Sequence, residues 1–149
     1  MIKKPLVLAG GEIEQLQSSD SLAPVPNTLS LENGGTVDLS ICTPVYITGA
    51  DAVDVADSGS LPNVIGITTG AIVVSTVGVI QTDGKLTATT AEWDARTGQT
   101  GGLTPGAAYY LGNWGAVVST PPTSGYLVRL GIAINLTDFE IKISRPIRL

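Results

Sequence analysis

The stretch that decides the fold is Phe139-Glu140-Ile141-Lys142-Ile143-Ser144, close to the end of the sequence. Apolar and polar residues alternate at every step, which is the period of a β-strand with one buried face and one face in water. Such a strand needs sheet neighbours and an apolar layer against its buried face. The stretch therefore predicts a β-sheet domain, and the segments around it indicate the same.

The segments that precede this stretch are typical of further short strands separated by turns. We expect a long strand over 126–134. Before it, 107–111 and 116–120 are expected to form a hairpin around Gly112-Asn113-Trp114-Gly115. Several short strands so closely spaced, with Gly and Pro between them, are typical of a sandwich or a barrel.

The earlier half of the chain is also rich in β-branched residues. Strands are expected over 45–48, 64–68 and 72–80. The dipeptide Asp83-Gly84 follows the last of them and is typical of the turn between two hairpin strands. This half therefore adds strands of its own to the predicted β domain.

Helix signals are nearly absent. The best candidate is one turn at 90–97, where Thr90 can act as the cap and Glu92 lies in the first turn. The predicted fold class is all-β: a compact β-sandwich or β-barrel of short antiparallel strands, with an extended N-terminal arm.

The N-terminal part contains two short apolar pieces, Leu6-Val7-Leu8 and the stretch 12–17. In the second, Ile13 and Leu16 lie three positions apart, which predicts one helical turn with an apolar stripe. One turn is too short to be stable alone in water. Neither piece provides a core, so both are expected to fold against something else.

A linker-like stretch follows at 18–27, where Pro24 and Pro26 favour an extended backbone. Two interpretations stay open: an arm that docks on another subunit, or a strand-bearing part of the β domain. The first interpretation divides the chain into two parts: an N-terminal arm, 1–31, and a β domain, 32–149. Within the β domain, 32–94 and 95–149 are candidate subregions.

The composition excludes several classes of function. The 149 residues include no histidine, so Ser-His triads and His-ligated metals are excluded, and Cys42 alone allows neither an internal disulfide nor a CxxC metal site. With 8 basic and 13 acidic residues the net charge is −5, which argues against general nucleic-acid binding. The apolar run 6–9 is too short for a signal peptide, and the uncharged run 58–82 is broken by Pro and Gly, so no membrane-spanning helix is expected.

The charges are distributed unevenly along the chain. Residues 31–94 carry one lysine against eight acidic residues, a net −7, whereas residues 95–149 carry five basic residues against two acidic ones, a net +3. Opposite charges on two halves can complement each other between copies, which favours self-association. Acidic residues can equally gather in loops for solubility alone.

No arrangement of residues predicts catalysis. Asp51, Asp54 and Asp57 are three apart, so in a strand they alternate between faces and are not expected to share a cation; a solvated acidic loop is expected instead. The glycine-rich stretch 98–106 lacks the Lys-Ser/Thr ending of a phosphate loop. We expect no enzyme, no cofactor and no small-molecule substrate, because nothing offers a tuned acid, base or nucleophile.

Aromatic residues leave two interpretations open. They can form a surface on which sugar rings stack, or they can fill a β core or a subunit contact, which is the commoner use of such residues. The residues in question are Trp93, Tyr109, Tyr110, Trp114 and Tyr126.

Two regions of the sequence resemble virion structural proteins of tailed bacteriophages. The run 93–111, which contains Leu103-Thr104-Pro105-Gly106 and the pair Tyr109-Tyr110, is similar to a module of those proteins. Its continuation through 119–126 to the strand with Gly131-Ile132-Ala133 fits the same module. The pieces 5–8 and 11–17 are similar to the leader segments of phage structural proteins, tail fibres included.

This resemblance implies a virion protein assembled in the host cytoplasm. A chain of this length is short for a fibre with its own shaft and tip, so the resemblance favours a capsid decoration (cement) protein. Such a protein binds the major capsid protein on the outer capsid surface as a homotrimer and stabilises the shell, without contacting nucleic acid or membrane. The alternative is a tail, collar or fibre component that takes part in host attachment or glycan binding.

The candidate interface residues are chosen by position and apolarity. They are Leu6, Val7, Leu8, Ile13, Leu16, Leu22, Tyr109, Tyr110 and Trp114.

Overall fold

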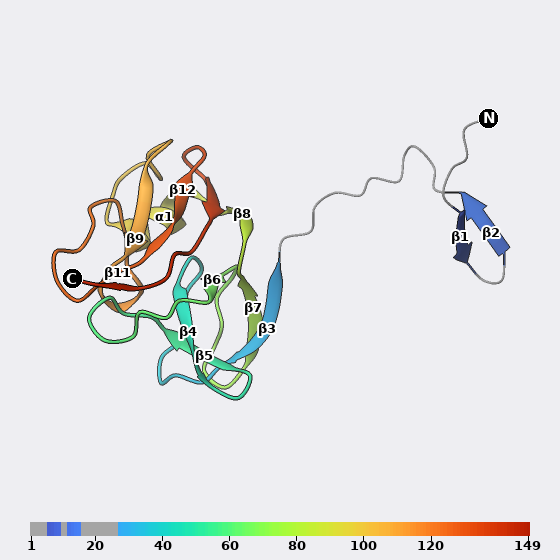
Figure 1. Ribbon diagram of the computed structural model, residues 1–149, viewed down its shortest axis with the longest axis horizontal. Coiled ribbons are helices and arrows are strands. Elements are labelled where there is room, and N and C mark those ends of the chain that lie inside the picture. Colours follow the sequence, from blue (N-terminus) through green and yellow to red (C-terminus); the bar gives the residue numbers. More distant parts are fainter. Residues whose placement is uncertain (1–5, 10–11, 16–26) are drawn as a thin grey trace.

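The computed structural model describes residues 6–9, 12–15 and 27–149. It confirms the all-β class: strands dominate, and the helices described are one short α-helix and one 3-10 turn. The strands from residue 28 onward form a closed barrel, a five-stranded sheet and a two-stranded ribbon (Figure 1). In Figure 1 the barrel lies below the five-stranded sheet.

The barrel is built from five strands in the order β3-β5-β4-β6-β7. Their bounds are Thr28–Asn33 (β3), Pro44–Gly49 (β4), Ala52–Val55 (β5), Gly66–Thr68 (β6) and Val77–Gln81 (β7). All neighbours pair antiparallel except β3 and β5, which are parallel, so the expectation of purely antiparallel strands was wrong at this seam. Apolar side chains fill the interior: Leu31, Leu39, Val45, Val53, Ile72 and Ile80.

The second sheet is antiparallel throughout, in the order β10-β9-β12-β13-β8. Its strands are Gly84–Thr87 (β8), Ala108–Leu111 (β9), Val117–Val118 (β10), Arg129–Ala133 (β12) and Asp138–Ile141 (β13). The alternating stretch 139–144 begins within β13, where Phe139 and Ile141 are buried. Beyond β13, the N–H groups of Lys142 and Ser144 still donate to two carbonyls of β12, those of Leu130 and Arg129.

Three aromatic rings form the centre of the core beneath this sheet. Phe139 contacts Trp93 at 5.4 Å and Tyr109 at 6.0 Å between ring centroids. Trp93 lies on α1 (Thr90–Thr97), whose N-cap is Thr89 rather than the predicted Thr90. Thr89 and Glu92 form a reciprocal capping box, which requires a spacing of three and therefore excludes Thr90 as the partner of Glu92.

The two halves share one apolar core. The larger cluster of buried residues contains Cys42, Ala56 and Ile67 from the barrel region together with the residues of the second sheet. The change from barrel to sheet occurs between Gln81 and Gly84, so β8 and α1 belong with the second sheet and not with the first subregion predicted, 32–94. The predicted boundary between 31 and 32 falls within β3, which is part of the barrel.

Four local expectations were wrong, because local patterns do not specify the partner with which a segment pairs. Of the expected strand 72–80, only the part from Val77 onward is a strand, β7. Before it, Ile72 forms an isolated bridge with Leu39. Asp83-Gly84 connects barrel and sheet and forms no hairpin. The expected strand 126–134 is split into β11 (Tyr126–Leu127), paired with β14 (Ile147–Arg148), and β12. The predicted helical turn at 12–17 is instead β2 (Glu12–Gln15), paired with β1 (Leu6–Ala9).

Cys42 lies where the barrel meets the second sheet and is fully buried. Burial raises the pKa of its thiol to about 12, and Glu92 adds to the effect. Because the thiolate is the reactive form, we expect Cys42 in the folded protein to be unreactive towards a disulfide reagent at pH 8. Titration of the native and the urea-unfolded chain checks this, and rapid labelling of the native protein would contradict it.

Candidate interaction surface

The residues predicted as an interface lie on different elements of the structure. Leu6, Val7 and Leu8 lie on β1 and Ile13 lies on β2, where the register sets Leu8 opposite Ile13. Leu16 and Leu22 lie outside the described residues.

The three aromatic residues of that prediction have different environments. Tyr109 is fully buried, so its assignment as an interface residue was wrong. Tyr110 is half-buried, and Trp114 has 72% of its surface exposed. The predicted sugar-stacking surface of five aromatics does not form either, because Trp93 is also fully buried.

Tyr109 is held in place by the glycine-rich loop. Its hydroxyl accepts a hydrogen bond from the Thr104 N–H at 2.8 Å and donates to Gln99 Oε1 at 2.6 Å. The Asp94 carboxylate accepts from the N–H groups of Gly101 and Gly102 at 2.9 and 2.7 Å. The donors of this loop are therefore used inside the fold, and the loop is structural.

Trp114 is presented by a rigid turn between β9 and β10. Its backbone is left-handed, with φ 50° and ψ 50°, a conformation that is uncommon outside glycine. Its N–H donates to Asp57 Oδ1 at 3.2 Å, and the N–H of Gly115 donates to the Ala56 carbonyl at 2.8 Å. A further bond joins Ser58 Oγ to Asn113 Oδ1 at 3.0 Å. An exposed indole is thus attached firmly to the segment after β5.

The sequence of the turn explains its shape. Gly115 has φ 73°, and a Cβ there would lie 2.6 Å from a methyl carbon of Val55. A glycine is therefore required beside the tryptophan. Asp57, predicted to be part of a solvated acidic loop with Asp51 and Asp54, is instead 8% exposed and binds this turn.

A small pocket of about 210 Å³ lies beside Trp114. It is formed between the barrel region and the last turn of α1, which contributes Arg96. Sequence analysis did not identify Arg96 as a site residue; its only signal was a basic residue at a helix end. The residues that line the pocket are Val37, Asp38, Leu39, Ser40, Thr43, Val55, Arg96 and Trp114.

A second exposed apolar patch lies on the barrel. Val77 and Val79 of β7 are 66% and 42% exposed, and the register sets them opposite Glu32 and Ser30 of β3. Residues two apart in a strand share a face, so the two valines lie side by side on the outside of the barrel. We call Val77 and Val79 the β7 patch.

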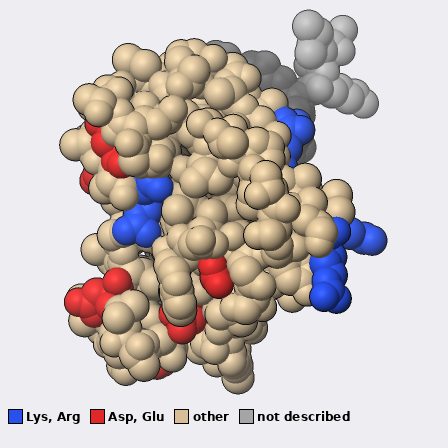
Figure 2. All heavy atoms as spheres, turned by 90° about the vertical axis from the view of Figure 1, so that its left-hand side faces the viewer, with Lys and Arg blue, Asp and Glu red and all other residues tan. Residues whose placement is uncertain are grey.

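Charged residues are sparse on much of the surface. Figure 2 shows one face on which acidic and basic side chains form small separate groups and most of the surface is neither. Within the described ranges, no group of three His, Cys, Asp or Glu residues is arranged to hold a metal ion. No helix in the described part is long and apolar enough to cross a membrane.

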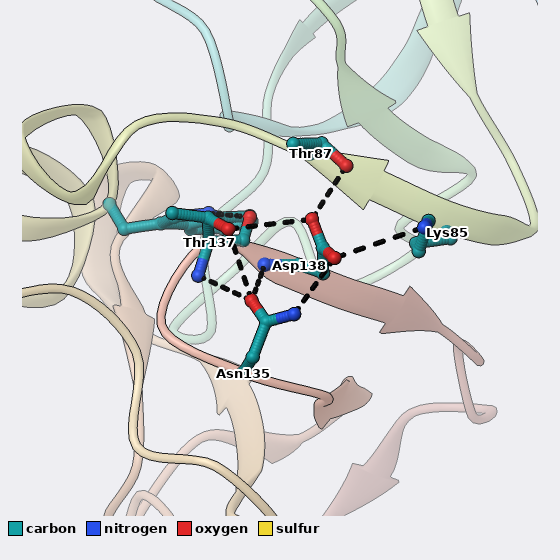
Figure 3. Close-up of polar contacts among 6 residues, drawn as sticks. Lys85, Thr87, Asn135, Thr137 and Asp138 are labelled. Atoms are coloured by element: carbon teal, nitrogen blue, oxygen red, sulfur yellow. Dashed lines mark hydrogen bonds and ion pairs between the residues drawn. The ribbon is translucent and has the colours of Figure 1, made fainter.

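Asp138, at the start of β13, organises a polar cluster on the second sheet (Figure 3). It accepts hydrogen bonds from Thr87 Oγ1 at 2.7 Å and Asn135 Nδ2 at 2.8 Å, and Lys85 Nζ lies 3.8 Å away. The hydrogen bond from Thr87, then that from Asn135, lowers the pKa of this carboxyl, and the Lys85 charge adds to the effect. The Asn135-Leu136-Thr137 sequon thus lies in a turn whose asparagine side chain is already bonded.

Asp138→Asn is expected to make the protein less stable at pH 7, by an amount that shrinks as the pH falls below about 4. The sign follows from the lowered pKa: the folded state binds the proton less tightly than the unfolded state, so its stabilisation is present above the unfolded pKa and is lost on acidification. Urea unfolding of both proteins between pH 3 and pH 7 measures the difference. A difference that stays constant over this range would contradict the assignment.

Comparison of the chain with known proteins finds no matching family model, no matching curated protein and no matching solved structure.

Proposed function

We propose that this chain is a bacteriophage capsid decoration protein that binds the outer capsid surface and stabilises the shell. The observation that supports the proposal best is the pairing of its strands. From Thr28 onward the chain closes a barrel and a sheet over a shared core, whereas β1 and β2 pair only with each other among the described strands. A lone hairpin of such short strands is marginally stable in water, so this one needs a partner surface.

The register of the hairpin fits a docking role. Leu6 and Leu8 of β1 lie opposite Gln15 and Ile13, whereas Ala9 lies opposite Glu12. Directly opposite residues share a face of a ribbon, so one face is mainly apolar in composition. Repeated over many copies on a shell, such modest contacts produce tight overall attachment through avidity.

The test is deletion of residues 1–26 followed by co-sedimentation with expanded capsids. Asn27 is kept because its carbonyl accepts the N–H of Thr82 at 2.8 Å. We expect the truncated protein to unfold at the same temperature as the full chain and to lose its capsid occupancy. Unchanged capsid occupancy would show that residues 1–26 are not needed for capsid binding.

Paired substitutions refine this test without removing the segment. Leu8→Ser with Ile13→Ser changes one cross-strand pair of the apolar face, and Ala9→Ser with Glu12→Gln changes the neighbouring pair as the matched control. The first pair is expected to reduce occupancy far more than the second. Equal losses would point to the hairpin as a whole and not to its apolar face.

We also propose that the protein is a homotrimer, with the β7 patch as the contact between copies. Exposed apolar side chains on a sheet face favour burial against another copy. Light scattering is expected to give three times the chain mass of 15.3 kDa. Val77→Glu should reduce that mass, whereas Val73→Glu, at a residue of similar exposure outside β7, should not. A monomer at working concentration would contradict the trimer.

The exposure of Trp114 favours a second candidate, a tail, collar or fibre component that binds host glycans. Copy number separates the two: a decoration protein is present in hundreds of copies on a virion protein gel, and a tail component in a handful. Under the second proposal Trp114→Ala reduces adsorption to host cells. Under the first, adsorption is unchanged.

A further inference from the structure

The pocket beside Trp114 contains an arginine, Arg96, that forms no ion pair with any residue the structure describes. Arg96 is half-buried at the end of α1, and its Nε is buried without a hydrogen-bond partner. Its Nη1 lies 3.5 Å from the position that a Cβ on Gly115 would take, next to Trp114. Between residues 27 and 149, the ion pair found joins Lys85 and Asp138, so no carboxylate of this part lies within 4.0 Å of Arg96.

Two acidic residues that share the helix or the pocket with Arg96 accept hydrogen bonds from other residues. Glu92, one helical turn before Arg96, accepts the N–H of Thr89 at 2.8 Å as part of the capping box. Asp38 lines the same pocket, but its Oδ1 accepts the N–H of Val74 at 2.9 Å. Each carboxylate thus satisfies a backbone donor, and Arg96 remains available.

An unpaired, partly desolvated guanidinium is unfavourable until it meets an anion. Its planar set of N–H donors matches a carboxylate best, since both can join through two parallel hydrogen bonds. The pocket volume of about 210 Å³ is smaller than that of a typical ligand site, so one side chain or one ring would fill it.

The polar groups of the pocket favour a protein side chain over a sugar. Thr43 Oγ1 donates to the Ser40 carbonyl at 2.7 Å, and the Ser40 hydroxyl lies 3.4 Å from Thr43 Oγ1. Few hydroxyl or amide groups therefore remain to bind the hydroxyls of a sugar. The rim consists instead of Val37 and Trp114, 57% and 72% exposed, which suit apolar residues on either side of an acidic one. Tryptophan and arginine are also the residues that most often dominate protein interfaces.

We propose that the Arg96 pocket binds a glutamate or aspartate side chain of a partner protein, with the flanking apolar residues of the partner packed on Trp114 and Val37. The identity of that partner as the capsid rests on the proposed function above; the chemistry of the pocket does not. The arm and the pocket then form two separate contacts of the same molecule.

The test uses a capped Leu-Glu-Leu tripeptide as the probe, with Leu-Gln-Leu and free glucuronate as comparison ligands. Nuclear magnetic resonance follows the Nε–H signal of Arg96 and the two indole N–H signals. We expect saturable shifts at Arg96 and Trp114 with the glutamate peptide, in the millimolar range, and none at the buried Trp93. The glutamine peptide is expected to bind at least about tenfold more weakly, because its amide can accept only one of the two parallel hydrogen bonds and has no charge to pair with the guanidinium.

Variants assign the effect to the pocket. Arg96→Gln is expected to weaken the glutamate peptide about tenfold, whereas Arg129→Gln, which also removes a buried unpartnered Nε outside the pocket, leaves it unchanged. Trp114→Ala, at an exposed position that does not affect folding, should also weaken binding. Asp38→Asn should strengthen it by removing a like charge.

Equal binding of the two peptides, or equal effects of Arg96→Gln and Arg129→Gln, would overturn the proposal. Binding of glucuronate alone would overturn it in favour of a glycan site. The experiment uses no capsids, so peptide binding without capsid occupancy would retain the pocket and reject the decoration function. Capsid occupancy without peptide binding would reject the pocket and retain the decoration function.

Discussion

Trp93→Ala is expected to lower the free energy of unfolding by about 3–5 kcal/mol, the usual cost of truncating a large core aromatic. The side chain is completely buried, packs at 5.4 Å on the ring of Phe139, and donates its Nε1–H to the Thr137 carbonyl at 2.8 Å. The substitution therefore leaves a large cavity in the core and removes one of the two hydrogen bonds to the Thr137 carbonyl, which still accepts the N–H of Ala88 at 3.1 Å. Chemical unfolding with urea measures the loss.

The chain contains its own matched control for this experiment. Trp114→Ala is the same substitution at a 72% exposed position and is expected to change stability by no more than about 0.5 kcal/mol. Trp93→Phe keeps a ring but loses the hydrogen bond to Thr137, at a cost of about 0.5–1.5 kcal/mol, because the N–H of Ala88 still satisfies that carbonyl. If the two alanine variants unfolded at the same urea concentration, the assignment of Trp93 to the core would be wrong.

Gly131→Ala is expected to cost about 3 kcal/mol or more, at the upper end of what overpacking does. A Cβ at Gly131 would overlap the carbonyl oxygen of Glu140 on β13 and lie 3.0 Å from a ring carbon of Phe139. Because the first obstacle is backbone in a central strand pair, no side-chain rotation relieves it. The β12–β13 pairing must shift, and with it the aromatic centre of the core.

Gly70→Ala is the control for this prediction, because a Cβ there meets nothing within 4 Å. It is expected to be neutral or slightly stabilising, since alanine reduces the entropy of the unfolded chain. Thermal unfolding of both variants against the unmodified chain provides the comparison. Similar unfolding temperatures for Gly131→Ala and Gly70→Ala would show that β12 and β13 do not approach as described.

Local patterns predicted the strands whose neighbours are close in sequence. The alternation at 139–144 correctly placed Phe139 and Ile141 on a buried face, and the turn 112–115 correctly joined β9 and β10. In both cases the side-chain period or the turn contains the information needed. The run 72–80 failed because strand propensity does not supply a pairing partner: the chain turns before β7, with Ser75 at φ 61°, although the residues around it are β-branched.

The candidate site also has one part that the sequence could predict and one part that it could not. Trp114 could be selected as a candidate from its position in a Gly-Asn-Trp-Gly turn, but its exposure and the burial of Tyr109 depend on which face of β9 meets the core. Arg96 was not selected, because its place in the pocket depends on the tertiary structure. The capping box of Thr89 and Glu92 is local, but the hydrogen bond from the Val74 N–H to Asp38 joins residues 36 positions apart, and no spacing along the chain expresses it.

The amino-acid sequence alone determined that this chain builds β-structure, where the short α-helix of the described residues lies, and which chemistries its composition cannot support. Those properties depend on residue type and short-range periodicity. Only the tertiary structure decided that the strands divide at 82–83 into a barrel and a sheet, that β3 and β5 run parallel, and that Trp114 and Arg96 meet at one pocket. The physical reason is that strand pairing and burial are settled between residues far apart in the chain, where many pairings satisfy the same local pattern and the packing of the shared core selects one.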